Sequence, residues 1–449
     1  MPLRTSLLRT LENPILSVND RVELCCELAR DFENQGKYEE ARKALSDYWR
    51  RIGEDPKLEG LEPSTAAELL LRVGVLTGYV GSKNQISDAQ ESAKDLITQS
   101  HTIFEARRNK KKIAEAQTEL ALIYWRTGEN HEARDCLNEA LALLSIDGEL
   151  KAKAVIRLAV VEFRAARHQK ALLILRKYAP LFDRIQNHTL KGSYHDTFGN
   201  VLEDLSVLKK RRDYVDRALI EYAAAGYHFE ESGHKSYLGY VENNLGMLYF
   251  RLNQCDEAHK HLDRARRIFK SLKDVGCMAQ VDETRASVFL RQRRFVEAEC
   301  VARSAVRNQE KTNRHGQLAE AVTTHGRALA RLERYGASLF AFRRAIDLYE
   351  HTGNMTRAAE VALAMVKELG EHLAAPECGQ LLSGSALGQV KLALEHHIIK
   401  LALDQAKGRI SEAARLAGMS WQALAYALRT RHKDLIDKRT PVRHRKRRK

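Results

Sequence analysis

Small residues recur along most of the chain in triplets, with large apolar residues between them. In most copies the first two members are twelve positions apart and the last two are seven apart. Small side chains lie where two helices cross closely, because a larger side chain would force the backbones apart. The pattern therefore predicts a series of helical hairpins. The eight copies are Ala29, Ala41, Tyr48; Gly74, Ala93, Ser100; Ala121, Ala133, Ala140; Ala159, Ala171, Tyr178; Gly199, Ala218, Ala225; Gly246, Ala258, Ala265; Ala286, Ala298, Ala305; and Gly326, Ser338, Ala345.

The spacing of the copies predicts one continuous array of about eight units over residues 20–372, after an N-terminal segment of residues 1–19. Three copies keep a strict 40-residue period, beginning at Gly246, Ala286 and Gly326. In the two copies that begin at Gly74 and Gly199, the first gap is nineteen positions rather than twelve. The added length is about two helical turns, so these hairpins should be longer while their apolar face stays in phase.

The pattern changes after the array. Pro376, Gly379 and Gly384 indicate a linker over residues 373–386. An amphipathic helix is then predicted up to Gln405. The residues of its apolar face are Leu387, Val390, Leu394, Ile398 and Leu401.

Residues 408–428 predict two short helices around a tight turn. Ala413 and Ala414 are small enough for a second helix to cross closely, and Leu416 should supply an apolar contact. Gly418 can adopt the left-handed conformation that ends the first helix, and Ser420 should cap the second. A helix, a three-residue turn and an exposed second helix form the geometry that enters the major groove of DNA.

The second of these helices should have one buried and one exposed face. Met419, Leu424 and Leu428 recur at helical spacing and should face inward. The residues expected to face outward are Trp421, Gln422, Ala423, Tyr426 and Arg429.

Composition agrees with an all-α protein. The chain has seven prolines, few β-branched runs and abundant Ala, Leu, Arg and Glu, so we expect no strands. Its seven cysteines form no C-x-x-C pair and are odd in number, which argues against a disulfide framework or a zinc ribbon. No run approaches the roughly 20 apolar residues of a spanning helix, and no signal-peptide core is present. We therefore expect a soluble protein of the reducing cytoplasm.

Positive charge is concentrated at the C-terminal end. The formal net charge is +15, and residues 391–449 contribute +11 of it, with sixteen Lys and Arg against five Asp and Glu. Residues 438–449 hold eight Lys or Arg and no acid, so we expect this tail to be disordered alone. The tail could be merely solubilising, but we favour contact with DNA phosphates because the charge directly follows the predicted helix-turn-helix.

The repeat carries further positions of fixed character. An aromatic residue stands three positions before the second small residue, as at Tyr38, Phe295 and Tyr335, and a large residue stands four positions after it, as at Leu45 and Phe342. This combination resembles the tetratricopeptide repeat over roughly residues 20–370. The proline that usually ends the second helix is missing, and the period is nearer 40 residues than the family's roughly 34. These departures suggest elongated hairpins.

The resemblance implies a helical solenoid whose inner, concave face is lined by the first helix of each pair. Such a groove would bind a protein, a peptide or a small ligand. The residues expected to be exposed in it are Asn200, Asn243, Asn244, Thr284, Thr324 and Arg327.

An arginine follows the first small residue by five positions in five of the units. These residues are Arg126, Arg164, Arg251, Arg291 and Arg331. A column of arginines could pair with carboxylate or phosphate groups of a ligand. It could equally be an exposed charged face whose partners are neighbouring glutamates, and we favour this second interpretation because charge at exposed repeat positions is common.

Residues 387–437 resemble the Fis-type (factor for inversion stimulation) helix-turn-helix domain, which also ends many bacterial enhancer-binding activators. The match follows the motif G-x-x-S-x-A-A-R-x-x-G-[hydrophobic]-S-x-x-x-L-x-x-x-L from Gly408 to Leu428. The resemblance implies double-stranded DNA as a partner and the pairing of two modules in a homodimer. The recognition helix departs from the family, because Trp421 and Ala423 replace commonly basic and Thr residues and an apolar run at 425–427 replaces a frequently basic one.

Some side chains of this helix can still contact the edges of bases. Apolar side chains can contact thymine methyl groups, Gln422 can pair with adenine, and Arg429 can contact phosphate or guanine. The expected DNA-binding residues are Arg409, Ser420, Trp421, Gln422, Ala423, Tyr426, Arg429, Lys438, Arg439, Arg443, Arg445, Lys446, Arg447, Arg448 and Lys449.

No catalytic motif stands out. The chain contains no G-x-x-x-x-G-K-[ST], no H-E-x-x-H and no G-x-S-x-G. The adjacent His396 and His397 would point in different directions on a helix rather than at one metal ion. We expect no enzymatic activity, no cofactor and no metal site.

These observations favour a bacterial DNA-binding transcriptional regulator whose repeat array senses or binds a protein, peptide or small ligand. The alternative is an adaptor whose array binds proteins while the basic C-terminus holds nucleic acid without reading its sequence. The departures in the recognition helix favour the adaptor, whereas the intact turn and core positions oppose it.

Overall fold

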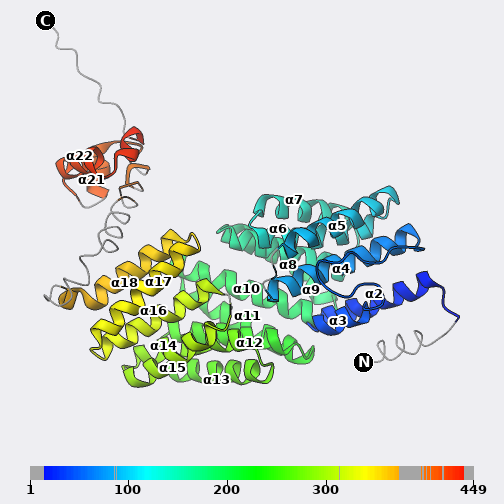
Figure 1. Cartoon of the computed structure of the whole chain (residues 1–449), viewed down its shortest axis with the longest axis horizontal. Helices are drawn as coiled ribbons and strands as arrows, with labels where there is room; N and C mark the ends of the chain where they lie inside the picture. The colour runs from blue at the N-terminus through cyan, green and yellow to red at the C-terminus, as the bar shows by residue number, and fades with distance from the viewer. Residues whose placement is uncertain are drawn as a thin grey trace, which may run out of the picture. The chain divides into compact units, whose positions relative to one another are not determined.

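A computed structural model describes residues 15–84, 86, 88–312, 314–373, 396, 399–400, 402–404, 406–416 and 419–438 of the chain. Every regular element within these residues is a helix (Figure 1). The predicted all-α fold is confirmed. None of the helices described is both long and apolar enough to cross a membrane.

The described part of the array consists of antiparallel hairpins that follow one another along the chain (Figure 1). Their number and positions match the copies of the small-residue triplet. The pairs are α2 (Val18–Asn34) with α3 (Tyr38–Ala44), α4 (Pro63–Asn84) with α5 (Ala89–Ala106), α6 (Lys110–Thr127) with α7 (Asn130–Leu143), α8 (Glu149–Arg164) with α9 (His168–Arg184), α10 (His188–Lys209) with α11 (Arg212–Glu231), α12 (Lys235–Arg251) with α13 (Cys255–Ser271), α14 (Val275–Arg291) with α15 (Phe295–Gln309), and α16 (His315–Arg331) with α17 (Tyr335–His351). The helix α18 (Met355–Leu373) follows.

The small residues lie at the crossings of the paired helices, as predicted. Ala258 and Ala265 are fully buried, and Gly246 faces Leu262 across the α12–α13 hairpin. A β-carbon built on Gly246 would lie only 2.5 Å from Leu262 Cγ. The close approach of the two backbones therefore depends on the missing side chain.

The two copies with the longer gap form longer hairpins. Helices α4 and α10 each have 22 residues, whereas α12, α14 and α16 each have 17. The added turns keep their apolar residues in the core, because Tyr222 and Phe229 on α11 are buried against Gly199 and Gly192 of α10. The predicted elongation is confirmed.

The chain divides into two compact units, residues 1–274 and residues 275–449. The boundary falls within the array predicted over residues 20–372, and the 40-residue period runs unchanged across it from Gly246 to Ala286. The repeat pattern reports packing within each hairpin, so it could not show where the array is divided.

The inner helices of the first unit carry buried ion pairs. Arg72 on α4 is only 1% exposed and lies 2.7 Å from carboxylate oxygens of both Glu33 on α2 and Glu115 on α6. Glu119 on α6 pairs with Lys153 at 2.6 Å on the following inner helix, α8. Ion pairs of this kind stabilise the array only while every partner is present, because removal of one would leave a buried charge.

The first hairpin also contacts the sixth. The turn residue Gly36 lies against the His234 ring at the start of α12. On the same first hairpin, the ring of Tyr38 stacks on that of Tyr79 of α4, in the second hairpin, with centroids 4.6 Å apart. His234 in turn stacks on Tyr237 at 3.9 Å. Burial lowers the pKa of His234 to about 4, so the ring is neutral in this contact. We call the contact of Gly36 with His234 the clasp.

The helix-crossing glycines make a paired prediction. Gly246→Ala should lower the free energy of unfolding by about 1–3 kcal/mol, because the new methyl group collides with Leu262. Gly326→Ala, at the same repeat position, should be neutral or stabilising by up to about 1 kcal/mol, because its β-carbon would lie an ordinary 3.4 Å from Ala341 and Phe342. Native-state hydrogen exchange of α12 and α16 measures both, and equal effects would contradict the packing argument.

The clasp makes a second prediction. Gly36→Ala and Gly60→Ala both place a side chain at positive φ (+70° and +73°), but only the first meets another group, His234 Nε2 at 2.7 Å. Gly36→Ala should therefore cost about 1–3 kcal/mol more than Gly60→Ala. Urea unfolding of the two variants measures the difference. In a His234→Ala background the difference should vanish, and its persistence would mean that the two residues are not in contact.

Candidate nucleic-acid interface and partner groove

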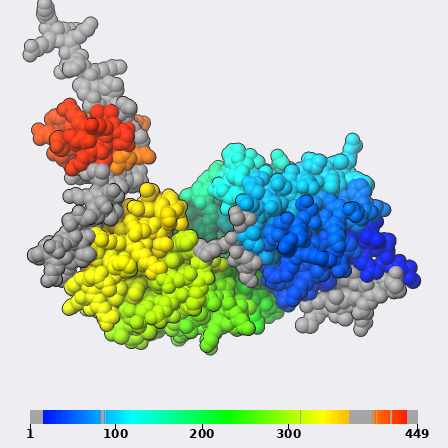
Figure 2. Space-filling model, in the orientation of Figure 1, coloured from blue at the N-terminus to red at the C-terminus, as the bar shows by residue number. Residues whose placement is uncertain are grey.

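The C-terminal module is built around a small buried core. Its described helices are α21 (Ile410–Leu416), α22 (Trp421–Thr430) and the 3-10 helix η1 (Lys433–Lys438). In the space-filling view these helices form the body drawn in red (Figure 2). The core residues are Ile399, Ala402, Leu403, Ala406, Ala413, Ala414, Leu424, Ala427, Leu428 and Leu435. The residues predicted to form the apolar face of the preceding helix lie outside the described part of the chain.

Ser420 caps α22 as predicted. Its backbone is extended (φ −70°, ψ 150°), and its hydroxyl oxygen accepts a hydrogen bond from the Ala423 N–H at 3.1 Å. This bond satisfies one of the free N–H groups of the first turn and fixes where the helix begins. The conformation predicted for Gly418 lies outside the described residues.

The exposed face of α22 carries the side chains expected there. Trp421 and Tyr426 are 60% and 64% exposed. Gln422, Ala423 and Arg429 are also exposed. Two exposed aromatic rings, an amide and a guanidinium on one short helix make this face a candidate contact surface.

The inward contact predicted for Leu416 is wrong. This side chain is 45% exposed and is not part of the module's core. The residues of α21 that are buried in this core are Ala413 and Ala414.

Arg409 is engaged locally. Its guanidinium pairs with Glu412 at 2.7 Å and donates to the Ala406 carbonyl oxygen at 3.2 Å. It remains 63% exposed, but its charge is partly neutralised. Lys438 ends η1, while the other predicted tail residues, 439–449, lie outside the described residues.

A polar network on the inner helices brings several predicted groove residues together. Asp196 on α10 accepts hydrogen bonds from the side-chain amides of Asn200 and Asn244, both at 3.2 Å. Asn200 accepts a bond from the Tyr222 hydroxyl at 3.1 Å. Burial raises the pKa of Asp196 to about 6, against the opposing effect of the two amide donors. Asn243, on the same helix as Asn244, has a buried side-chain oxygen with no hydrogen-bond partner among the described residues.

The exposure predicted for Thr284 and Thr324 is wrong. They are only 2% and 3% exposed. The Thr324 hydroxyl on α16 donates to Glu283 of α14 at 2.6 Å, so this residue links two inner helices instead of facing a ligand. Arg327 is exposed, as predicted.

The arginine column divides into two kinds. Arg251 pairs with Glu203 and Arg331 with Glu368, at 2.7 and 2.8 Å, which confirms the favoured interpretation for these residues. Arg126 instead donates to the Gly78 carbonyl oxygen at 2.8 Å and lies over the Tyr79 ring. Arg164 lies over the Phe163 ring. Arg291 is exposed and has partners of its own.

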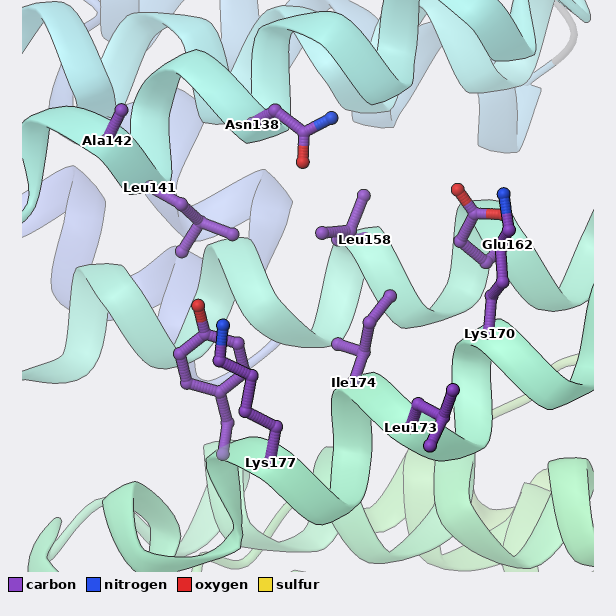
Figure 3. A pocket seen from close by; sticks show the side chains of 10 residues that line it. Asn138, Leu141, Ala142, Leu158, Glu162, Lys170, Leu173, Ile174 and Lys177 are labelled. Atoms are coloured by element: carbon purple, nitrogen blue, oxygen red, sulfur yellow. The ribbon is translucent and has the colours of Figure 1, made fainter.

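A groove of about 550 Å³ lies on α7, α8 and α9, and it contains none of the predicted residues (Figure 3). Leu141, Leu158 and Ile174 form its centre, with Lys170 and Lys177 at its edge. Nothing in the repeat pattern indicated it beyond the bulky Tyr178 at a position that usually holds a small residue.

Buried Glu283 predicts a pH dependence of stability. Burial raises the pKa of this carboxyl from 4.5 to about 7, with the nearby Glu320 adding to the rise and Arg327 opposing it. The folded state therefore favours the neutral form, and wild-type stability should fall as the pH rises from about 4.5 to 7. Glu283→Gln cannot ionise, so it should be more stable than wild type by about 2–3 kcal/mol at pH 8 and by much less at pH 4. Denaturation curves at both pH values measure this, and parallel profiles would contradict it.

Comparison with known proteins agrees with this geometry. Residues 91–184 and 243–272 match models of the tetratricopeptide repeat, and residues 393–430 match the model of the Fis family of bacterial regulatory proteins. No curated protein matches the chain in sequence.

Several solved structures are similar in fold. A Rap protein complexed with competence and sporulation factor is 12% identical, and the match covers 83% of this chain and 97% of that one with a TM-score of 0.54. The human IFIT1 dimer with PPP-AAAA is 15% identical over 81% and 76% of the two chains, with a TM-score of 0.51. Aspartyl phosphate phosphatase F from Bacillus subtilis is 14% identical over 84% and 96%, with a TM-score of 0.50. At these identities the likeness concerns the fold alone.

The repeat matches lie within the hairpin array and the third match lies on the module of α21 and α22. The chain therefore combines tetratricopeptide repeats with a C-terminal helix-turn-helix domain of the Fis family of bacterial regulatory proteins.

Proposed function

We propose that the protein is a bacterial transcriptional regulator that binds DNA through its C-terminal module and binds a protein, peptide or small ligand through its repeats. The observation that carries the proposal is the geometry of α22. Its first turn is fixed by the Ser420 cap, and Trp421, Gln422, Tyr426 and Arg429 stand exposed along one face. This is the face that a recognition helix presents to the major groove.

The exposed side chains can make different kinds of contact with DNA. Gln422 can pair with an adenine edge, and Arg429 with guanine or a phosphate. Trp421 and Tyr426 can contact thymine methyl groups and the sugar backbone. The basic tail adds phosphate contacts that carry no sequence information, and each of these makes binding more sensitive to salt.

Two copies of the module are needed in this proposal. One α22 has a single charged side chain, Arg429, and few polar groups that can reach base edges. A homodimer doubles these contacts and reads a palindromic site, with half-sites spaced by the protein's own symmetry.

The repeats are the sensing part of the proposal. The Rap structure holds competence and sporulation factor and the IFIT1 structure holds PPP-AAAA, so proteins with this solenoid fold do bind ligands. In this chain the inner helices offer Asn200 and Asn244 beside Asp196, and Asn243 has a buried side-chain oxygen with no hydrogen-bond partner among the described residues. We assign the protein a binding role without a catalytic step, in the cytoplasm where a bacterial chromosome is accessible.

The second candidate is an adaptor that holds nucleic acid by charge alone. The observation in its favour is the apolar character of α22, WQALAYALRT, next to a tail with eight Lys or Arg. The two candidates differ in whether the exposed residues of α22 give the protein a preference for one DNA sequence.

Selection of fragmented genomic DNA by the full-length protein separates them. In a regulator, Gln422→Ala with Arg429→Ala should abolish the preferred site, with about 1–3 kcal/mol less discrimination for each base that is no longer read. Deletion of residues 438–449 should weaken binding to all sequences and reduce the salt slope by about 0.9 for each phosphate that is no longer neutralised. Arg307→Ala, an exposed cation on α15, is the control and should change neither. No preference in the wild type, with binding lost only when residues 438–449 are deleted, would favour the adaptor. A preference that survives the double variant would show that Gln422 and Arg429 are not the residues that read the site.

A further inference from the structure

A pocket of about 820 Å³ lies in the first unit, where the second, third and fourth hairpins meet. Gln90 from the start of α5, Trp125 and Arg126 from the end of α6, Asn130 from the start of α7 and Arg164 from the end of α8 contribute to its lining. The volume is within the range of pockets that hold small organic ligands.

The two arginines of this pocket differ from the others in their column. No described carboxylate lies within ion-pair distance of Arg126 or Arg164, whereas Arg251 and Arg331 each have one. The closest described groups to the Arg126 guanidinium are a carbonyl oxygen and an aromatic ring. Arg126 is partly buried, and such a guanidinium without an anion is unfavourable, because its charge has left water and has no full partner in exchange. Arg164 is exposed, so an anion can reach it from solvent.

The surrounding charges do not supply the missing anion. Glu119, the nearest buried acid on α6, already faces two cations, Lys153 at 2.6 Å and Arg157 at 2.8 Å. Burial lowers the pKa of Arg126, and the positive charge of Arg157 adds to this effect. The inner face around the third and fourth hairpins therefore carries an excess of positive charge.

Asp196 is an acid whose carboxyl interacts electrostatically with Arg164, but it forms no ion pair with this arginine among the described residues. The positive charge of Arg164 acts on the Asp196 carboxyl, but the carboxyl accepts its hydrogen bonds from Asn200 and Asn244. Burial raises the pKa of Asp196 to about 6, against the opposing effect of the two amide donors. Arg164 therefore remains available to an anion from outside the chain.

Two further features of the pocket favour an anionic ligand with hydrogen-bonding groups. Helix α7 begins at Asn130, whose N–H donates to the Gly128 carbonyl oxygen at 2.9 Å, and no described side chain caps the first turn. The positive end of the helix dipole at this start favours an anion. Gln90 donates to the Gly78 carbonyl oxygen at 2.9 Å, while its own side-chain oxygen is buried without a partner among the described residues. A ligand donor could complete that oxygen's hydrogen bonding.

We propose that this pocket binds a small anionic ligand, whose carboxylate or phosphate group lies between Arg126 and Arg164. The proposal rests on the ligand-binding role given to the repeats above and specifies its chemistry. A guanidinium presents paired N–H donors that match the oxygens of either group, and Trp125 offers a flat apolar wall to the rest of the ligand.

Thermal unfolding of the full-length protein without DNA tests the site. Inorganic phosphate and citrate are added separately, each compared with sodium chloride at equal ionic strength. Both anions also stabilise proteins by exclusion from their surface, so variants isolate the specific part. Arg164→Gln should lose it, with an affinity at least about tenfold weaker. Arg331→Gln, at the same repeat position but paired with Glu368, should keep it.

The outcomes are distinct. A response to phosphate alone assigns a phosphoryl ligand, a response to citrate alone assigns a carboxylate ligand, and both require that Arg164→Gln abolish the response. Wild type and Arg164→Gln responding equally to both anions, or not at all, would overturn the site. Arg126→Gln, checked by circular dichroism for an intact fold, gives a second and independent reading. DNA selection is measured separately, so a failed anion site leaves the DNA-binding proposal standing, and the reverse also holds.

Discussion

The close crossing of paired helices at small residues is the constraint on which the rest of the structure depends. At Gly246 the neighbouring Leu262 already occupies the space that a β-carbon would need. The same requirement sets the positions of Gly74 and Gly199 in the long hairpins. Because each crossing fixes how two helices lie together, it also fixes which side chains of the first helix face inward. The inner charges, the Asp196 network and the arginine column are all consequences of this register.

Inside the first unit, this register places charged residues where water is largely excluded. Arg72, Glu33 and Glu115 come from three successive inner helices and form one ion cluster. Such a cluster is costly unless its charges balance, and here the arginine has its carboxylates. Arg126 departs from that rule, because it contacts the Gly78 carbonyl oxygen and the Tyr79 ring and has no carboxylate at ion-pair distance among the described residues. The clasp adds a contact between the first and sixth hairpins.

Periodicity in the sequence was sufficient to predict the hairpins, because a small residue at a crossing is a local requirement that each repeat must satisfy. It also placed Ser420, Leu424 and Leu428 correctly, since an N-cap and a helical face depend on neighbours only a few residues away. Leu416 was misplaced, since the residues of α21 that are buried in the core are Ala413 and Ala414.

Contacts between distant helices were beyond the reach of periodicity. Thr324 looked like an exposed groove residue, but its partner Glu283 lies one repeat away. Asp196 and Glu203 carried no signal at all, because an acid on a helix face looks the same in the sequence whether it is solvated or paired.

The composition of α22 is known from the sequence alone, and it determines how the module can use DNA. A helix with one arginine and one glutamine on its exposed face can discriminate between bases but gains little free energy from phosphates. A tail rich in lysine and arginine has the opposite properties, since phosphate contacts raise affinity for every sequence equally. A regulator built in this way gains specificity mainly by pairing two modules, because a second α22 adds base contacts whereas a stronger tail would add only nonspecific binding.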